Sequence, residues 1–278
     1  MFVKSVDSAD DLLRELIPTL RSYDLVLNEA KSVVMLKSAR YTEEPDLEAL
    51  FANAIDEISL QGDDDDFDAD YGFQSEWDED NDEDDLELKA TKLLFNSLFD
   101  YPGHEENIER FCLPLFSKAG SDFAVEHVLD AFKKRPSMSQ IYASYLSKFL
   151  DTEGVHDFLV QILADLTVAD WQKMWTLAAL SQTEPNDDGP VKVALGVLKD
   201  ANRHEALRAV AATYVGRFGD HTRRKALISV YPKVSNYIQA AIYYSSNGWP
   251  KAERSNAKAS WAGHGPLHKL LTLAMAKK

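Results

Sequence analysis

From residue 86 onward the sequence alternates between short amphipathic segments and breaks, and this pattern restricts the fold more than any other feature. Apolar residues recur every three to four positions, which is the spacing of one buried helix face. The breaks carry Gly, Pro, Asn or Asp, which end helices and form turns. Such short helices with short connections are typical of helical pairs stacked into a repeat array. We predict a mainly α fold with helices over 86–99, 105–117, 121–134, 137–150, 154–164, 168–181, 190–199, 203–218, 221–230, 233–245 and 265–276.

The clearest repeat-like unit covers residues 202–220. It places small residues on the side predicted to be buried and arginines on the other, and it closes with Gly219 and Asp220. In these respects it resembles one helix of a HEAT repeat. No regular repeat period is present along the chain, so the prediction of a HEAT-like domain over 86–278 depends on helix lengths and on this unit.

A strongly acidic segment precedes this domain. Residues 56–88 contain seventeen Asp or Glu and no Lys or Arg. We predict that residues 61–85 form a disordered linker, because so many like charges cannot be buried together. A calcium-binding loop beginning at Asp66 is disfavoured, since Gly72 and Glu76 would occupy positions seven and eleven instead of six and twelve. A second possibility is that the acids and interspersed aromatics mimic nucleic acid and occupy a basic groove.

Composition sets broad limits on the class of protein. With 278 residues and 45% hydrophobic residues, the chain can form one or two domains with a substantial core. Cys112 is the only cysteine, so no disulfide can form within the chain, which suits a reducing compartment. Neither a signal peptide nor an apolar run near the roughly 18 residues of a membrane helix is recognisable. We therefore expect a cytoplasmic protein that does not span a membrane.

The net charge of −16 hides a basic C-terminal third. Residues 199–278 carry fourteen Lys or Arg and four Asp or Glu, a difference of +10. Such a patch can bind the phosphates of RNA or DNA, and aromatics at Tyr237, Tyr243, Tyr244, Trp249 and Trp261 could stack on bases. The alternative is that the aromatics form core and the charges a solvated face. The predicted nucleic-acid-binding residues are Arg203, Arg208, Arg217, Arg223, Arg224 and Lys225.

The N-terminal residues have a different pattern. An apolar pair at Phe2 and Val3 precedes an amphipathic helix over 10–23, and a second apolar run ends at Met35. Strand, helix and strand in so few residues form an incomplete α/β unit, because two strands alone are only marginally stable. A connecting helix is expected within 41–60, with its apolar face over 47–58.

This N-terminal stretch resembles the end of the palm of a reverse transcriptase. In that family the catalytic Tyr-x-Asp-Asp turn is followed by an apolar strand, a Leu-rich acidic helix and a Gly-Leu-x-Leu-Asn-x-x-Lys-Thr segment. Asp24 stands here in place of the usual Gly and Ser32 in place of the usual Thr. The matching residues are Phe2-Val3-Lys4-Ser5, Leu12-Leu13-Arg14-Glu15-Leu16 and Tyr23-Asp24-Leu25-Val26-Leu27-Asn28-Glu29-Ala30-Lys31-Ser32.

The resemblance implies that the chain is the C-terminal portion of a bacterial RNA-directed DNA polymerase. It would be of the kind found in retroelements or of the kind that aborts phage infection. Residues 1–40 would be the end of the palm, and Lys31 would lie near the outgoing pyrophosphate, whose charge a cation stabilises. No Tyr-x-Asp-Asp precedes Phe2, so this chain alone is not expected to polymerise DNA. It would need no cofactor itself, and Mg²⁺ would act only with an upstream palm. The helical domain would bind nucleic acid, a protein partner or that upstream polymerase portion.

A second interpretation belongs to a different class of protein. In it, the chain is a stand-alone helical scaffold that binds protein, and the palm-like stretch is coincidental. No metal site is predicted, because the only cysteine and the scattered histidines lack the spacing of zinc ligands. No phosphate-binding loop and no nucleophile elbow occurs in the sequence.

Overall fold

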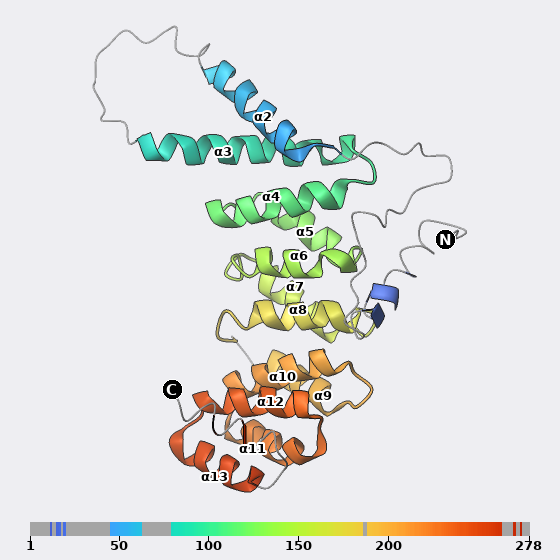
Figure 1. Ribbon diagram of the computed structural model, residues 1–278, viewed down its shortest axis with the longest axis vertical. Coiled ribbons are helices and arrows are strands. Elements are labelled where there is room, and N and C mark those ends of the chain that lie inside the picture. The colour runs from blue at the N-terminus through green and yellow to red at the C-terminus, as the bar shows by residue number, and fades with distance from the viewer. Residues whose placement is uncertain are drawn as a thin grey trace. The chain divides into compact units, whose positions relative to one another are not determined.

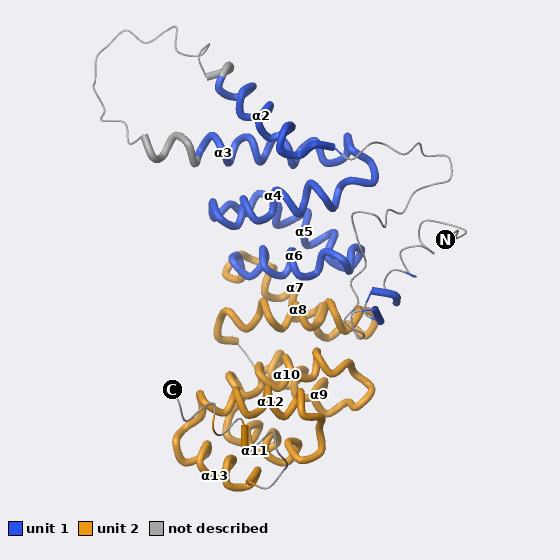
Figure 2. Tube along the Cα trace, in the orientation of Figure 1, with its two compact units in different colours: residues 1–149 blue, residues 150–278 orange. Residues whose placement is uncertain are grey.

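The computed structural model describes residues 45–62, 79–185 and 188–262, together with nine residues of short flanking pieces, 12, 15–17, 19, 20, 269, 270 and 273. Every regular element within these residues is helical, which confirms the prediction of a mainly α protein (Figure 1). The chain divides into two compact units, residues 1–149 and 150–278 (Figure 2).

Unit 1 contains helices that pack in chain order. They are α2 (Leu47–Gly62), α3 (Glu79–Asn96), η2 (Ser97–Asp100), α4 (Glu105–Ala119), α5 (Val125–Ala131), η3 (Pro136–Met138) and α6 (Ser139–Leu146). Helix α2 packs on α3, α3 on α4, and α4 on α6. Edge-to-face aromatic pairs join these helices: ring centroids are 5.3 Å apart for Phe51 of α2 and Phe111 of α4, and 5.5 Å apart for Phe95 of α3 and Phe116 of α4. Gly120, in the left-handed conformation at φ +64°, ends α4.

The division into compact units does not coincide with the predicted domain bounds, which remain a prediction. The sequence predicts a boundary in the acidic segment 61–85, whereas the two units divide after Phe149. The physical reason is that α2 and α3, which flank this segment, pack on each other in the same unit. The backbone is also helical from Glu79, so the last residues of the predicted linker belong to α3. The rest of that linker, residues 63–78, lies outside the described residues.

Unit 2 is built from a second series of short helices. They are α7 (Val155–Ala164), α8 (Asp170–Leu180), α9 (Gly189–Lys199), α10 (Glu205–Phe218), α11 (His221–Val230), η4 (Tyr231–Lys233), α12 (Asn236–Ser245), η5 (Ser246–Gly248) and α13 (Lys251–Trp261). Helix α10 is central, because it contacts α8 on one flank, α12 on the other, and α9 and α11 as well. Helices α8, α10 and α12 therefore form one layer, and they follow one another down the view in Figure 1.

Helix α13 was not expected from the sequence. Only two of its residues, Ala257 and Trp261, are buried, so it lacks the apolar stripe that identifies a helix. The Trp261 ring stacks on Tyr231 with centroids 4.3 Å apart, and Trp249 lies edge-on to Trp261 at 6.1 Å.

Cys112 provides a probe of the unit 1 core. It is fully buried in α4, and burial together with the nearby Glu109 charge raises the pKa of its thiol to about 12. The thiolate is the reactive form, so the folded protein should react with a disulfide reagent only when unit 1 opens. We expect no reaction within the mixing time in buffer and complete reaction in denaturant, measured as thionitrobenzoate release. Fast reaction of the folded protein would contradict this packing.

Candidate functional site

The palm-like stretch lies almost entirely outside the described residues. Lys31 and the predicted strands are among the residues that are not described, and only six positions of the preceding predicted helix are. The chemistry that the resemblance implies for Lys31, and for Mg²⁺ supplied with an upstream palm, remains a prediction.

Arg203 and Arg208 hold unit 2 together near the start of α10. The Arg203 guanidinium lies 3.0 Å from Asp170 of α8 and 3.3 Å from Asp200. The second Asp170 oxygen accepts a hydrogen bond from the His204 backbone N–H at 2.8 Å. Arg208 Nε donates to the Leu198 carbonyl at the end of α9, at 3.0 Å. Both arginines therefore have partners within their own unit.

Arg223 and Arg224 are also engaged, at the start of α11. Arg223 forms ion pairs with Asp188 at 3.0 Å and Asp220 at 3.4 Å. Arg224 donates to Glu253 of α13 at 2.6 Å and to the Gly219 carbonyl at 2.6 Å. The hydrogen bond from Arg224 lowers the pKa of the Glu253 carboxyl, so this acid stays ionised beside its partner.

Arg217 and Lys225 are the exposed members of the predicted basic set. The Arg217 guanidinium lies over the Phe218 ring, 4.9 Å from its centroid, and no carboxylate of the described residues pairs with it. Arg217 and Arg224 line a hollow of about 470 Å³ together with Glu184, Pro185, Asp188, Val191, Phe218 and Gly219. The structure thus groups Arg217 with Arg223 and Arg224, intermixed with acids. Arg203 lies at the other end of α10, roughly 20 Å of helix away.

A different feature stands out on the α8–α10–α12 layer. Each helix carries one stripe of incompletely buried residues at helical spacing, on the side away from its buried residues. Because α8 and α12 flank α10, the three stripes lie side by side on the outside of the layer. We define this surface as the apolar face, made of Trp171, Met174, Trp175, Ala178, Ala206, Val210, Thr213, Arg217, Tyr237, Ala240, Ala241 and Tyr244.

Residue size varies across the apolar face. Its central helix contributes Ala206, Val210 and Thr213, which are small, and both neighbours contribute large aromatics. On α8, Trp171 and Trp175 meet edge to face with centroids 5.6 Å apart. On α12, the side chains at 237 and 244 are 58% and 66% exposed, which is high for tyrosines in a packed helix. Arg217, at one end, is the only charged residue of this surface.

The sequence contains a signal for this face. By sequence alone, Tyr237 and Tyr244 are candidates for base stacking or for the core, as are Tyr243, Trp249 and Trp261. The structure separates them, because the last three are buried. Residues 236–245 contain no charged side chain, so α12 is apolar on more than the one side that its neighbours bury.

Unit 1 has a buried polar cluster on the facing sides of α4, α5 and α6. Glu109 is fully buried, and His127 Nε2 donates to its Oε1 at 2.6 Å while Tyr142 Oη donates to its Oε2 at 2.5 Å. Arg135 forms an ion pair with the same carboxylate. Burial alone would raise the pKa of Glu109, but the His127 hydrogen bond, the Arg135 charge and the Tyr142 hydrogen bond lower it overall. The carboxylate is thus ionised and fully occupied, which indicates a structural role.

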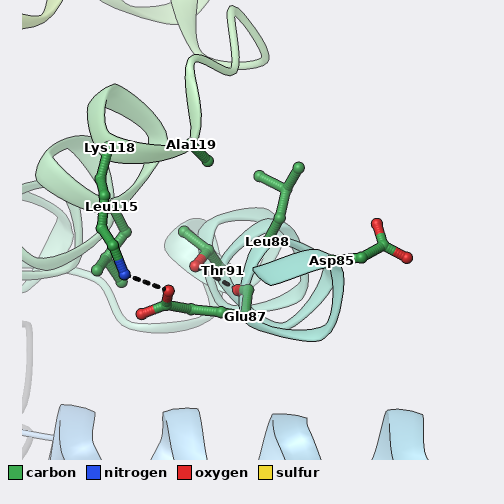
Figure 3. A pocket seen from close by; sticks show the side chains of 7 residues that line it. All are labelled: Asp85, Glu87, Leu88, Thr91, Leu115, Lys118 and Ala119. Carbon is green, nitrogen blue, oxygen red and sulfur yellow. Dashed lines mark hydrogen bonds and ion pairs between the residues drawn. The ribbon is translucent and has the colours of Figure 1, made fainter. Parts of the chain in front are cut away.

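A smaller hollow of about 350 Å³ lies between α3 and α4. Figure 3 shows Lys118 of α4 directed toward Glu87 of α3, and their charged atoms are 2.9 Å apart. Leu88, Thr91, Leu115 and Ala119 supply most of the remaining lining. The hollow is also lined by Asp85, which pairs with Lys89 at 2.7 Å. Because its charged side chains already have partners, we interpret it as a surface groove and not as a chemical centre.

Within the described residues, no three His, Cys, Asp or Glu side chains gather closely enough to hold a metal ion. None of the described helices combines the length and the apolar character that a membrane span requires. No family model, no curated protein and no solved structure matches this chain.

Proposed function

We propose that this protein is an α-helical repeat scaffold that binds a protein partner through the apolar face of unit 2. The observation that supports this most is a surface of aromatic and small apolar side chains with a single charge, on a chain whose net charge is −16. Extended exposed apolar patches on soluble domains mark interaction sites. Interfaces are enriched in Trp, Tyr, Met and Arg, and all four are present here.

Binding of RNA or DNA by the basic C-terminal third has weaker support. Four of its six predicted residues, Arg203, Arg208, Arg223 and Arg224, already bind oxygens of their own chain. A phosphate would have to displace those partners, which removes much of the gain from ion release. Arg217 and Lys225, which are exposed, are the residues of this set that could bind phosphates without losing such a partner. The relation to a reverse transcriptase also remains a hypothesis, supported by the sequence resemblance of residues 2–32.

The proposal is tested with the Val210→Asp variant. Val210 is at the centre of the apolar face, and an acid there would be desolvated on binding. We expect the full chain to retain a protein from extracts of its source cells and Val210→Asp to retain it at least about tenfold less, which corresponds to about 1.4 kcal/mol. Band intensities after affinity capture, followed by titration with the purified partner, measure the effect.

Val197→Asp is the matched control, since Val197 is also half-buried but belongs to α9, outside the apolar face. It should retain the partner like the wild type, and melting temperatures of the two variants should agree. Equal retention by Val210→Asp would contradict the proposal. Low-salt retention of RNA or DNA that is lost in Arg217→Glu/Lys225→Glu would favour the nucleic-acid hypothesis instead.

A further inference from the structure

We infer that the hollow of about 470 Å³ in unit 2 binds a small zwitterion, whose carboxylate pairs with Arg217 and whose amine pairs with Glu184. The inference goes beyond the proposed function, because Arg217 is the only residue of this hollow that also belongs to the apolar face. It depends on two opposite charges that line one hollow and do not neutralise each other.

The hollow lies where four segments of unit 2 meet. These segments are the residues that follow α8, the start of α9, the end of α10 and the start of α11. They contribute, in this order, Glu184 and Pro185, Asp188 and Val191, Arg217, Phe218 and Gly219, and Arg224. Sites for small molecules are concave and combine apolar walls with a few convergent polar groups that orient the ligand. This hollow has both components.

Polar contacts within unit 2 hold the walls of the hollow. Arg223 pairs with Asp188 at 3.0 Å, which joins the start of α11 to the start of α9. Arg224 donates to the Gly219 carbonyl at 2.6 Å and to Glu253 at 2.6 Å, which joins α11 to the end of α10 and to α13. Walls that are already connected do not have to become ordered when a ligand binds, which lowers the entropic cost of binding.

The charged side chains of the hollow differ in what they already bind. Asp188 and Arg224 have the partners just described, whereas Arg217 and Glu184 are exposed and form no ion pair or side-chain hydrogen bond with any described residue. The Phe218 ring covers one face of the Arg217 guanidinium and leaves its N–H edges free for a two-point contact with a carboxylate. The Glu184 carboxylate can accept hydrogen bonds from an ammonium group.

The balance of charges favours a zwitterion over a simple ion. Two cationic and two anionic side chains line the hollow, so it has no net charge that would attract a phosphate or a simple amine. An anion beside Arg217 would be repelled by Glu184, and a cation beside Glu184 would be repelled by Arg217. A molecule with both charges gains from both residues, and its hydrocarbon part can contact Pro185 and Phe218.

Titration of the full chain with a series of ω-amino acids tests the inference. The series runs from glycine to 6-aminohexanoate and moves the amine away from the carboxylate by one methylene at a time. Saturation-transfer NMR of the ligands measures each Kd. We expect the best member to bind with a Kd of about 1 mM or below, and acetate and butylamine to bind at least about tenfold more weakly.

Two variants assign the charges. Arg217→Gln and Glu184→Gln should each weaken binding of the best member by at least about tenfold. The first should also abolish the preference over butylamine, and the second the preference over acetate, which a purely structural role would not do. Lys199→Gln and Glu205→Gln are the matched controls, since both residues are exposed and lie at the ends of α9 and α10 away from the hollow. Both should bind like the wild type.

The outcomes are decisive for the hollow alone. Absence of binding by every member of the series at about 10 mM overturns the inference. Binding that Arg217→Gln and Glu184→Gln leave unchanged overturns it as well, and so does acetate or butylamine binding as tight as that of the zwitterions. An equal loss of binding in the control variants would also contradict it. None of these results bears on protein binding at the apolar face, which Val210→Asp tests.

Discussion

Replacing Glu109 with glutamine is expected to lower the free energy of unfolding of unit 1 by about 3 kcal/mol, because the change removes one partner of a buried ion pair. In the variant, Arg135 and the Tyr142 hydroxyl would face a neutral amide instead of a carboxylate. His127 would lose its carboxylate acceptor. Arg135 is a quarter exposed, so water offsets part of the loss and the lower end of the usual range applies. The reaction of the Cys112 thiol with a disulfide reagent at increasing denaturant concentration reports the unfolding of unit 1 separately from unit 2, because Cys112 is the only cysteine and lies in α4.

The pH dependence of this cluster has a definite sign. The folded-state pKa of Glu109 is lowered, so its contribution to stability is present above the unfolded pKa of about 4.3 and disappears as pH falls through the folded value. The wild type should therefore lose unit 1 stability on acidification below about pH 4, and Glu109→Gln should show a flatter profile there.

Glu106, one helical turn earlier, is the matched control. Burial raises its pKa despite hydrogen bonds from Ser137 Oγ at 2.9 Å, so ionisation of this carboxyl costs stability near neutral pH. Glu106→Gln keeps an acceptor for the hydroxyl and removes a charge that is only partly buried, and it should leave unit 1 as stable as the wild type or more so. Equal losses in the two variants would show that the Glu109 cluster has no special role.

Replacing Gly216 with alanine is expected to destabilise unit 2 by about 2 kcal/mol, within the range for overpacked cores. The new Cβ would lie 2.1 Å from Ser245 Oγ and 2.4 Å from Ser245 Cβ, so α10 and α12 must separate. The better helix propensity of alanine, up to about 1 kcal/mol, offsets only part of this cost. Thermal unfolding followed by Trp fluorescence measures this loss of stability, because Trp249 donates a hydrogen bond to the Gly216 carbonyl and so reports on the crossing of α10 and α12.

Gly196 supplies the control for this prediction. It lies inside α9, and no atom comes within 4 Å of the place that an added Cβ would take, so Gly196→Ala should stabilise unit 2 by about 0.5–1 kcal/mol. In the double variant Gly216→Ala/Ser245→Gly the clash is removed, and most of the lost stability should return. If Gly216→Ala proves neutral, or the added Ser245→Gly change does not restore stability, the close crossing of α10 and α12 is contradicted. Separation of these helices should also weaken binding at the apolar face.

Helix positions followed from local sequence. The expected helices at 105–117 and 154–164 correspond to α4, Glu105–Ala119, and α7, Val155–Ala164. Each has an apolar spacing that shows one buried side, and such a pattern needs no knowledge of the partner helix. Helix α13 was not predicted, because two buried residues in eleven do not form a helical pattern.

Tertiary structure decided the rest. Arg224 reaches Glu253, twenty-nine residues away, and Arg203 reaches Asp170, thirty-three residues away, so whether an arginine is free or paired could not be deduced from the sequence around it. The same holds for Tyr243 and Tyr244, neighbours in α12, of which one is buried and the other exposed. The sequence by itself determined the helices and their buried sides, because helix formation and amphipathicity depend on neighbours within a few residues. Only packing determined which charges are neutralised and which apolar stripe is incompletely buried, because these depend on residues that the chain brings together from far apart.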